Sequence, residues 1–264
     1  MVYYFSKFPL IVKLQIQAIL FFTLILIFAQ IAIQFDNRIV EGVNPWIKPS
    51  KFAISFIIHC ATALLIVLLL TSEGQNSSKV KWAIIILIIT CIVDLSYISI
   101  QAARGRSSHF NDDTIIEKIA YTIMGFGGVV VAIAPVFLIP SIRKNGGRFM
   151  TPGLRLGFIL GLILSAAFTI ITAAFMVSYH GPFIGHGGSK ATGIPIFGWS
   201  TEVGDLRVPH FLSTHLLQMI PFAGWLLDRW IAKHAEMGVW IFAFLTTFIV
   251  EMTVFQALIG LPLI

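Results

Sequence analysis

Residues 82–102 read WAIIILIITCIVDLSYISIQA, an apolar run that contains a single charged residue, Asp94. A helix of this length is about 30 Å long, which matches the hydrocarbon core of a bilayer. Six further apolar runs have similar lengths, so the sequence predicts an all-α, polytopic transmembrane helix bundle of about seven spans. The expected spans are approximately residues 13–34, 52–71, 82–102, 118–141, 154–178, 210–229 and 238–262.

The composition agrees with this class of protein. Hydrophobic residues make up 57% of the 264 residues and charged residues 11%, whereas soluble domains carry roughly 25% charged residues. The connections are too short for a separate soluble domain, so we expect one transmembrane domain over residues 1–264, surrounded by lipid bilayer. The net charge of +6 comes from Lys and Arg in the connections, where it favours anionic lipid headgroups; nucleic-acid binding is not expected.

The connections also predict an orientation. Ten of the 18 Lys and Arg residues fall on the amino-terminal side, including those of the densest short connection, IRKNGGRFMTPGLR at 142–155. The positive-inside rule therefore predicts a cytoplasmic amino terminus. The first, third and fifth connections share the other face, and the fifth, residues 180–209, is long enough to be a lid or a binding loop.

Four ionisable residues are expected within the hydrocarbon: His59, Asp94, His215 and Glu251. A charged side chain there costs on the order of 2.5–3.5 kcal/mol, so such residues usually face a cavity, a partner or a ligand. The rise of a helix per residue places all four at comparable depth beneath one face. The sequence therefore predicts a polar vestibule that opens toward the 180–209 loop.

Helical spacing adds polar neighbours to Asp94. Asp94, Tyr97 and Gln101 fall at positions i, i+3 and i+7 of the third span. Residues at this spacing lie on one face of a helix. We therefore expect a polar stripe that leads toward Arg104 and His109.

The first functional hypothesis is a metal or haem centre for redox or hydrolytic chemistry. Neutral imidazole is the commonest metal ligand, and four His residues fall near one membrane face. The expected ligands of a transition metal or haem b are His59, His109, His210 and His215, with Asp94 or Glu251 as catalytic proton acceptor or as partner of a ligand. The expected contacts of a small-molecule or lipid substrate are Arg104, Asp205, Arg207 and Gln218, in which the two Arg hold an anionic group.

The alternative hypothesis is a proton-coupled carrier of a small solute. His59 and Asp94 are 35 residues apart, and His215 and Glu251 are 36 apart. A His and a carboxylate thus recur at matching places in spans one to three and five to seven. A parallel internal repeat linked by the fourth span would produce this pattern, with the solute site between the halves.

Other motifs indicate packing. Small residues recur every four positions in the fifth span, which favours close contact with another helix; they are Gly153, Gly157, Gly161 and Ser165. Cys60 and Cys91 fall within apolar runs, so we expect buried thiols rather than a disulfide framework.

The start of the fourth span carries a capping motif. Thr114 is followed three residues later by Glu117, the spacing of a capping box. Asp112 and Asp113 precede it. Because negative charge is favourable at a helix N-terminus, we expect these two residues to stabilise the helix rather than to bind calcium.

Three strings resemble those of a group of bacterial multi-pass inner-membrane proteins. They are NPWIKPSKFAIS at 44–55, QAARGRSSHFN at 101–111 and GWSTEVGDLRVPHFLSTHLLQ at 198–218. The resemblance covers about a fifth of the chain, with a matching order of spans around it. It implies a location in a bacterial inner membrane and directs attention to the Arg and His residues of these strings, but it implies no activity.

A looser similarity is to the seven-span metal hydrolases that include alkaline ceramidases and adiponectin-receptor-like proteins. Ser55-x-x-x-His59 followed by Asp94 is similar to their S-x-x-x-H and Asp. The late histidines, however, are five residues apart here instead of four. The similarity therefore implies only the chemical idea of a His and carboxylate site in a helix bundle.

Overall fold

The computed structural model describes residues 8–111, 114–185, 193–194 and 197–264. The chain divides into two compact units, Met1–Phe149 and Met150–Ile264, which we call the amino-terminal and the carboxy-terminal unit. Both are built almost entirely of helices, as the sequence predicts. The prediction of one transmembrane domain over the whole chain is not tested by this division and stays a prediction.

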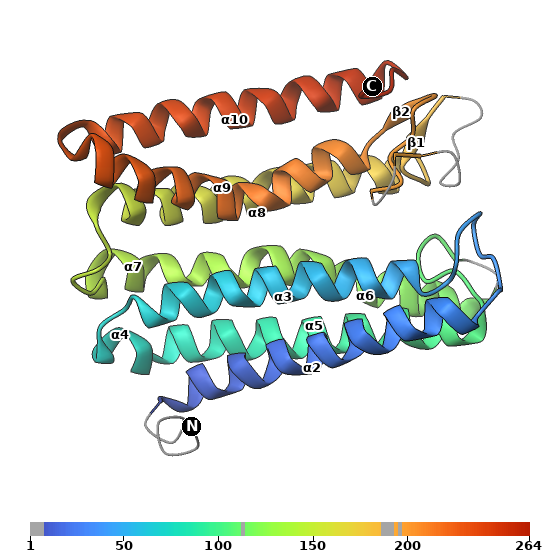
Figure 1. Ribbon diagram of the computed structural model, residues 1–264, viewed down its shortest axis with the longest axis horizontal. Coiled ribbons are helices and arrows are strands. Elements are labelled where there is room, and N and C mark those ends of the chain that lie inside the picture. Colours follow the sequence, from blue (N-terminus) through green and yellow to red (C-terminus); the bar gives the residue numbers. More distant parts are fainter. Residues whose placement is uncertain (1–7, 112–113, 186–192, 195–196) are drawn as a thin grey trace. The chain divides into compact units, whose positions relative to one another are not determined.

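The described residues of the amino-terminal unit form four long helical segments (Figure 1). They are α2 (Leu10–Phe35), α3 (Ile47–Leu68), α5 (Ser78–Arg104) and the continuous run of α6 (Ile115–Ile133), η1 (Ala134–Leu138) and α7 (Ile139–Asn145). The short α4 (Ser72–Asn76) connects α3 to α5. Pro135 lies in the first turn of η1, where the helix tightens to 3₁₀ geometry, because proline cannot donate the usual backbone hydrogen bond.

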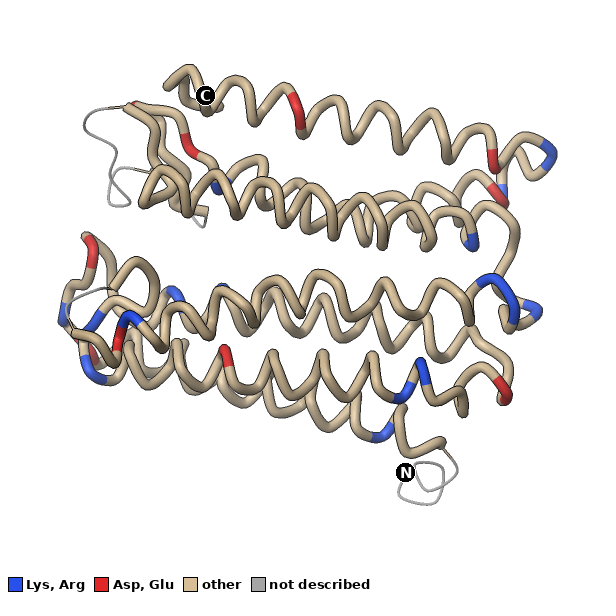
Figure 2. The backbone as a smooth tube through the Cα atoms, turned by 180° about the vertical axis from the view of Figure 1, so that it is seen from behind, with Lys and Arg blue, Asp and Glu red and all other residues tan. Residues whose placement is uncertain are grey.

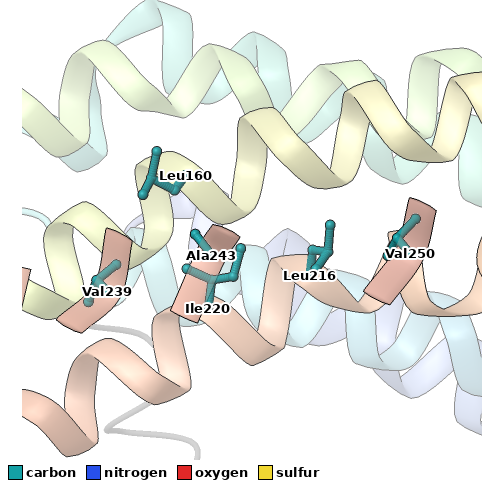
Figure 3. Close-up of a cluster of buried hydrophobic side chains, with 6 residues drawn as sticks. All are labelled: Leu160, Leu216, Ile220, Val239, Ala243 and Val250. Atoms are coloured by element: carbon teal, nitrogen blue, oxygen red, sulfur yellow. The ribbon is translucent and has the colours of Figure 1, made fainter. Parts of the chain in front are cut away.

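In the carboxy-terminal unit, the described residues form three long helices and a small hairpin. Its elements are α8 (Pro152–Ser178), β1 (Phe183–Ile184), β2 (Gly204–Asp205), α9 (Arg207–Trp230), η2 (Ala232–His234) and α10 (Ala235–Leu258). β1 and β2 pair antiparallel, with Phe183 opposite Asp205. The core contains Leu160 of α8, Leu216 and Ile220 of α9, and Val239, Ala243 and Val250 of α10 (Figure 3).

Small residues bring α8 and α9 together. A Cβ atom at Gly157 would lie 2.7 Å from the Cα atom of Pro221, and a Cβ atom at Gly161 would lie 3.1 Å from the carbonyl oxygen of Leu216. Ser165 donates a hydrogen bond of 3.0 Å to the carbonyl oxygen of a residue in α9. The predicted small-residue stripe is therefore a helix contact surface.

Among the residues that the structure describes, six helical segments are long and apolar enough to cross a membrane. They correspond to six of the seven predicted spans. The remaining one is the sixth in chain order, predicted at 210–229; it lies within α9, which is of similar length but less apolar. Figure 2 shows Lys and Arg gathered mainly at the ends of the long helices and in the connections, with few charges along the helices. The fold is thus an all-α bundle of six to seven spans.

Candidate proton-binding site

Asp94 lies on the buried face of α5. Asp94 is 5% exposed and lies in the middle part of a membrane-length helix. Gly127 of α6 faces the carboxylate, because a Cβ atom at position 127 would lie 2.5 Å and 2.7 Å from its two oxygens. Among the residues that the structure describes, none donates a hydrogen bond to this carboxylate. Asp94 is therefore an enclosed carboxylate at the contact of two helices.

A hydrogen-bonded chain begins one helical turn from Asp94. The amide nitrogen of Gln101 donates to the Tyr97 hydroxyl at 3.0 Å. Arg104 Nη1 in turn donates to the Gln101 amide oxygen, also at 3.0 Å. Gln101 is 1% exposed, so this part of the chain is shielded from solvent. The predicted polar stripe is confirmed for Tyr97, Gln101 and Arg104.

Glu117 of α6 ends this chain. Its Oε1 atom lies 3.4 Å from Arg104 Nη2 and 2.7 Å from Arg106 Nη1. The Glu117 side chain is 4% exposed, whereas the two Arg side chains are 49% and 45% exposed. One buried carboxylate is thus held by two arginines whose outer parts remain accessible.

The capping box predicted for this helix holds Glu117 in place. The Thr114 hydroxyl accepts a hydrogen bond of 3.2 Å from the Glu117 backbone N–H. Thr114 also lies 3.4 Å from the Glu117 carboxylate. The motif therefore starts α6 and orients the carboxylate that pairs with the arginines. Asp112 and Asp113 lie outside the described residues.

A second charged pair fixes the first connection to the same end of α5. Arg38 donates hydrogen bonds of 2.6 and 2.8 Å to the Asp36 carboxylate, and one of 3.1 Å to the carbonyl oxygen of Ala103. Trp46 Nε1 donates a further hydrogen bond of 2.8 Å to Asp36. The hydrogen bonds from Arg38, above all, lower the pKa of Asp36 below its ordinary value. This pair stabilises the backbone beside Arg104.

The two predicted ligands of the amino-terminal unit lie in different surroundings. His109 sits in the connection after α5, with its ring 5.4 Å from that of Phe52 and 6.2 Å from that of Tyr121. Its Nδ1 atom is 3.0 Å from the Ser108 hydroxyl. His59 is half-buried in α3, next to the buried Cys60. Aromatic packing therefore accounts for much of the position of His109.

Asp205 and Arg207 of the carboxy-terminal unit bind each other. Their closest atoms are 2.5 Å apart, and the Asp205 side chain is fully buried. Asp205 also accepts a hydrogen bond of 2.9 Å from the backbone N–H of Ser200, and Arg207 donates one of 2.6 Å to the carbonyl oxygen of Gly198. The pair thus organises the end of the long connection at the start of α9. The substrate role predicted for it stays a prediction.

The histidines of α9 have polar partners within the carboxy-terminal unit. His210 Nδ1 lies 3.0 Å from the Thr172 hydroxyl of α8, and His215 Nδ1 lies 3.1 Å from the Gln218 side-chain oxygen. Glu251 lies on the exposed face of α10. Its position therefore differs from that of Asp94, which is enclosed by neighbouring helices.

The predicted metal centre draws its ligands from both units. His59 and His109 belong to the amino-terminal unit, whereas His210 and His215 belong to the carboxy-terminal unit. Within the described part of the chain, no group of three or more His, Cys, Asp or Glu side chains is arranged to hold a metal ion. The metal or haem hypothesis and the shared vestibule stay predictions.

Sequence reasoning missed the contributions of Arg106 and Gly127. Arg106 pairs with a carboxylate eleven residues later, across a connection whose path the sequence does not reveal. Gly127 belongs to a group of glycines that indicates helix packing in general, without indicating Asp94 as the partner. The sequence does place a carboxylate, Glu117, in the first turn of a span, shortly after several arginines. That proximity could have predicted an ion pair between Glu117 and one of them.

Comparison with known proteins adds no relative: no protein-family model, curated protein or solved structure matches this chain. The resemblance of the three strings to bacterial inner-membrane proteins stays a prediction.

Proposed function

We propose that this protein is a proton-coupled carrier of a small solute and that Asp94 binds the coupled proton. The observation that carries the proposal is a chain of polar contacts. It runs from the Glu117–Arg104 ion pair through the hydrogen bonds of Gln101 to Tyr97, and it ends one helical turn from Asp94. Ionisable residues within membrane spans are costly, and they commonly serve as proton relays in transporters. The buried carboxylate has the chemistry for that role.

The chain brings polar groups from the end of α5 to within one helical turn of Asp94. Carboxyl and hydroxyl groups both accept and donate protons, and Glu117 and Tyr97 supply these groups at the two ends. Gln101 and Arg104 hold the hydroxyl and the carboxylate in position. A proton would reach Asp94 from the side where Arg104 and Arg106 are half-exposed.

The architecture of the two units gives separate support. Among α2, α3 and α5, the contact between α2 and α3 is the most extensive. The contact between α3 and α5 is smaller, and that between α2 and α5 is the smallest. The helices α8, α9 and α10 follow the same order. A parallel internal repeat, as found in several carriers, would produce this likeness. The enclosed Asp94 and the exposed Glu251 show that the two triplets differ in their carboxylates.

The proposal includes a bacterial inner membrane and a cytoplasmic amino terminus. The excess of Lys and Arg in the connection at 142–155 supports this orientation. Reporter fusions at that connection should give a cytoplasmic signal, and an external signal there would reverse the orientation.

Solute uptake by proteoliposomes tests the proposed function. Wild-type protein is reconstituted, an inward proton gradient is imposed, and uptake of acetate, succinate, inorganic phosphate, an amino acid and a sugar is measured. We expect gradient-dependent uptake of at least one solute, loss of that uptake in Asp94→Asn, and retention in Glu73→Gln, which alters an exposed carboxylate of α4. Uptake by Asp94→Asn at the wild-type rate would contradict the proposal.

A further inference from the structure

Glu251 is a carboxylate within an apolar stretch of α10. It lies seven residues before the end of this membrane-length helix at Leu258, which is about 10 Å at the rise of an α-helix. Its residue is exposed, whereas the neighbouring Val250 belongs to the core of the unit. Among the residues that the structure describes, none donates a hydrogen bond to the Glu251 carboxylate or pairs with it. Lipid tails would therefore surround this carboxylate unless another molecule covers it.

Glu251 belongs to a stripe of exposed side chains along α10. They follow one another at intervals of four, three and four residues, and we call them the Glu251 stripe: Phe244, Phe248, Glu251 and Phe255. The three phenylalanines are 48–68% exposed, and the rings of Phe244 and Phe248 stack with centroids 6.5 Å apart. Side chains that alternate at three and four positions form the seam along which two parallel helices pack. The spacing therefore suits a second helix, and the carboxylate lies within the seam.

We propose that the Glu251 stripe is a contact surface between two copies of this chain, in which the two α10 helices lie side by side and the two Glu251 side chains face each other. Ionisable residues within a membrane rarely face lipid, because hydrocarbon offers them no hydrogen bond. Lipid would accommodate the three phenylalanines equally well, so the carboxylate is the residue that requires a protein partner. The inference goes beyond the carrier proposal and does not depend on it.

A second copy provides a suitable partner at the right depth. Two copies that insert with the same topology and are related by a two-fold axis along the membrane normal place residue 251 of each at equal depth. A carboxylic acid that carries its proton has an O–H donor and a carbonyl acceptor, so it can pair with an identical group or donate to a carboxylate. Symmetry therefore supplies the hydrogen bond that the described residues of a single chain do not give to Glu251.

The nearby charged pair of the same unit does not serve as this partner. Asp205 lines a small cavity together with Thr253, a buried residue two positions from Glu251. Residues two positions apart point to nearly opposite sides of a helix, so Asp205 lies beside the buried side of α10. Asp205 and Arg207 also bind each other, with their closest atoms 2.5 Å apart. The partner of Glu251 therefore comes from outside this pair.

Disulfide cross-linking in isolated membranes tests the contact surface. Cys60 and Cys91 are replaced by alanine in the full-length protein, and one cysteine is introduced by Phe248→Cys or, as the control, by Ile249→Cys. The two positions lie at nearly the same depth and are similarly exposed, at 48% and 52%, but only Phe248 belongs to the stripe. We expect Phe248→Cys to give a covalent dimer under mild oxidation and Ile249→Cys to give little. Equal cross-linking of the two variants, or none in either, would overturn the proposal.

Substitution of Glu251 tests the role of its carboxyl group in protein that keeps both native cysteines. Copies fused at the amino terminus to a donor or an acceptor fluorescent protein are reconstituted together in phosphatidylcholine vesicles. Energy transfer between them is measured as the protein-to-lipid ratio is lowered. We expect Glu251→Leu to weaken the dimer about three- to thirtyfold, the range of an interhelical hydrogen bond in a membrane. Glu251→Gln keeps a donor and an acceptor, so its dimer should stay within about threefold of wild type.

The leucine variant separates dimer formation from membrane insertion. Leucine is more soluble in hydrocarbon than a carboxylate, so a weaker dimer in Glu251→Leu cannot result from poorer insertion. A dimer of equal strength in Glu251→Leu and wild type, or wild-type protein that is monomeric at every ratio, would contradict the proposal. Monomeric protein that takes up solute would refute the contact surface and leave the carrier standing. A dimer without solute uptake would refute the carrier alone.

Discussion

The carboxylate of Asp94 lies directly against the backbone of Gly127, at the contact between α5 and α6. A Cβ atom at position 127 would lie 2.5 Å from one oxygen and 2.7 Å from the other, which is closer than such atoms pack. Glycine at 127 therefore makes room for an ionisable group between two membrane-length helices. The arrangement places the charge where an ordinary packed helix pair would have apolar side chains.

Gly127→Ala should destabilise the amino-terminal unit, because its methyl group must displace the Asp94 carboxylate or α6. We expect a loss of about 1–3 kcal/mol in the free energy of unfolding, as is typical of overpacking. Gly128→Ala, where a Cβ atom meets open space, should leave the stability unchanged or raise it by up to about 1 kcal/mol. Unfolding in mixed detergent micelles measures both variants. Equal stabilities of the two would show that residue 127 does not pack against Asp94.

Gly157→Ala should weaken the contact between α8 and α9. Its Cβ atom would lie 2.7 Å from the Cα atom of Pro221 and 2.9 Å from the carbonyl oxygen of Ile220, and backbone atoms cannot move aside without shifting the helix. We again expect a loss of about 1–3 kcal/mol. The control is Gly181→Ala, beyond the end of α8, which has open space for a Cβ atom. Thermal melting measures the stability of both variants. A Gly157→Ala protein more stable than Gly181→Ala would contradict this packing.

The Asp36–Arg38 pair should make stability depend on pH in the acid range. The pKa of Asp36 is lowered in the folded protein by hydrogen bonds from Arg38, so the unfolded chain binds a proton more readily. The stabilisation is therefore fully present above the ordinary value, near 3.8, and is lost as the pH falls from there through the lower pKa of the folded state.

Melting temperatures of wild type and Asp36→Asn between pH 7 and pH 3 measure this effect. We expect wild type to be more stable at pH 7 and the difference to shrink below pH 3.8. Glu73→Gln, at an exposed carboxylate of α4, should show no comparable trend. A difference between wild type and Asp36→Asn that stays constant over this range would argue against the ion pair.

Metal removal distinguishes the carrier from the metal or haem hypothesis. The polar chain from Glu117 to Tyr97 and the Asp94 carboxylate need no metal ion for proton binding. Solute uptake should therefore persist after the protein is treated with a strong chelator and dialysed. Loss of uptake that returns on addition of a transition metal, or a haem absorption band in the purified protein, would favour the metal or haem hypothesis instead.

The sequence predicted the helices and those features of the site that depend on spacing along a single helix. Long apolar runs require helices of membrane length, and the spacing of Asp94, Tyr97 and Gln101 requires a shared helix face. The glycine stripe of α8 and the capping box of α6 were equally readable. Each of these features depends on residues close together in the chain.

Contacts between helices were harder to predict, because they depend on how each helix is rotated about its axis. Gly127 lies in the fourth predicted span, but only the structure shows that it faces Asp94. Arg207 was expected to hold a substrate anion, and the structure shows it bound to Asp205. The sequence places His210 and Thr172 38 residues apart, so their contact across α8 and α9 could not be read from spacing.

The coupling of solute movement to a proton on Asp94 is the central claim, and proton flux measures it most directly. Proteoliposomes with a pH-sensitive dye inside are given the solute that wild type takes up, with no imposed proton gradient, and the internal pH is recorded. We predict solute-dependent acidification in wild type, none in Asp94→Asn, and partial recovery in Asp94→Glu, which restores a carboxylate in the same helix. Solute-dependent acidification of equal size in Asp94→Asn and wild type would contradict the account.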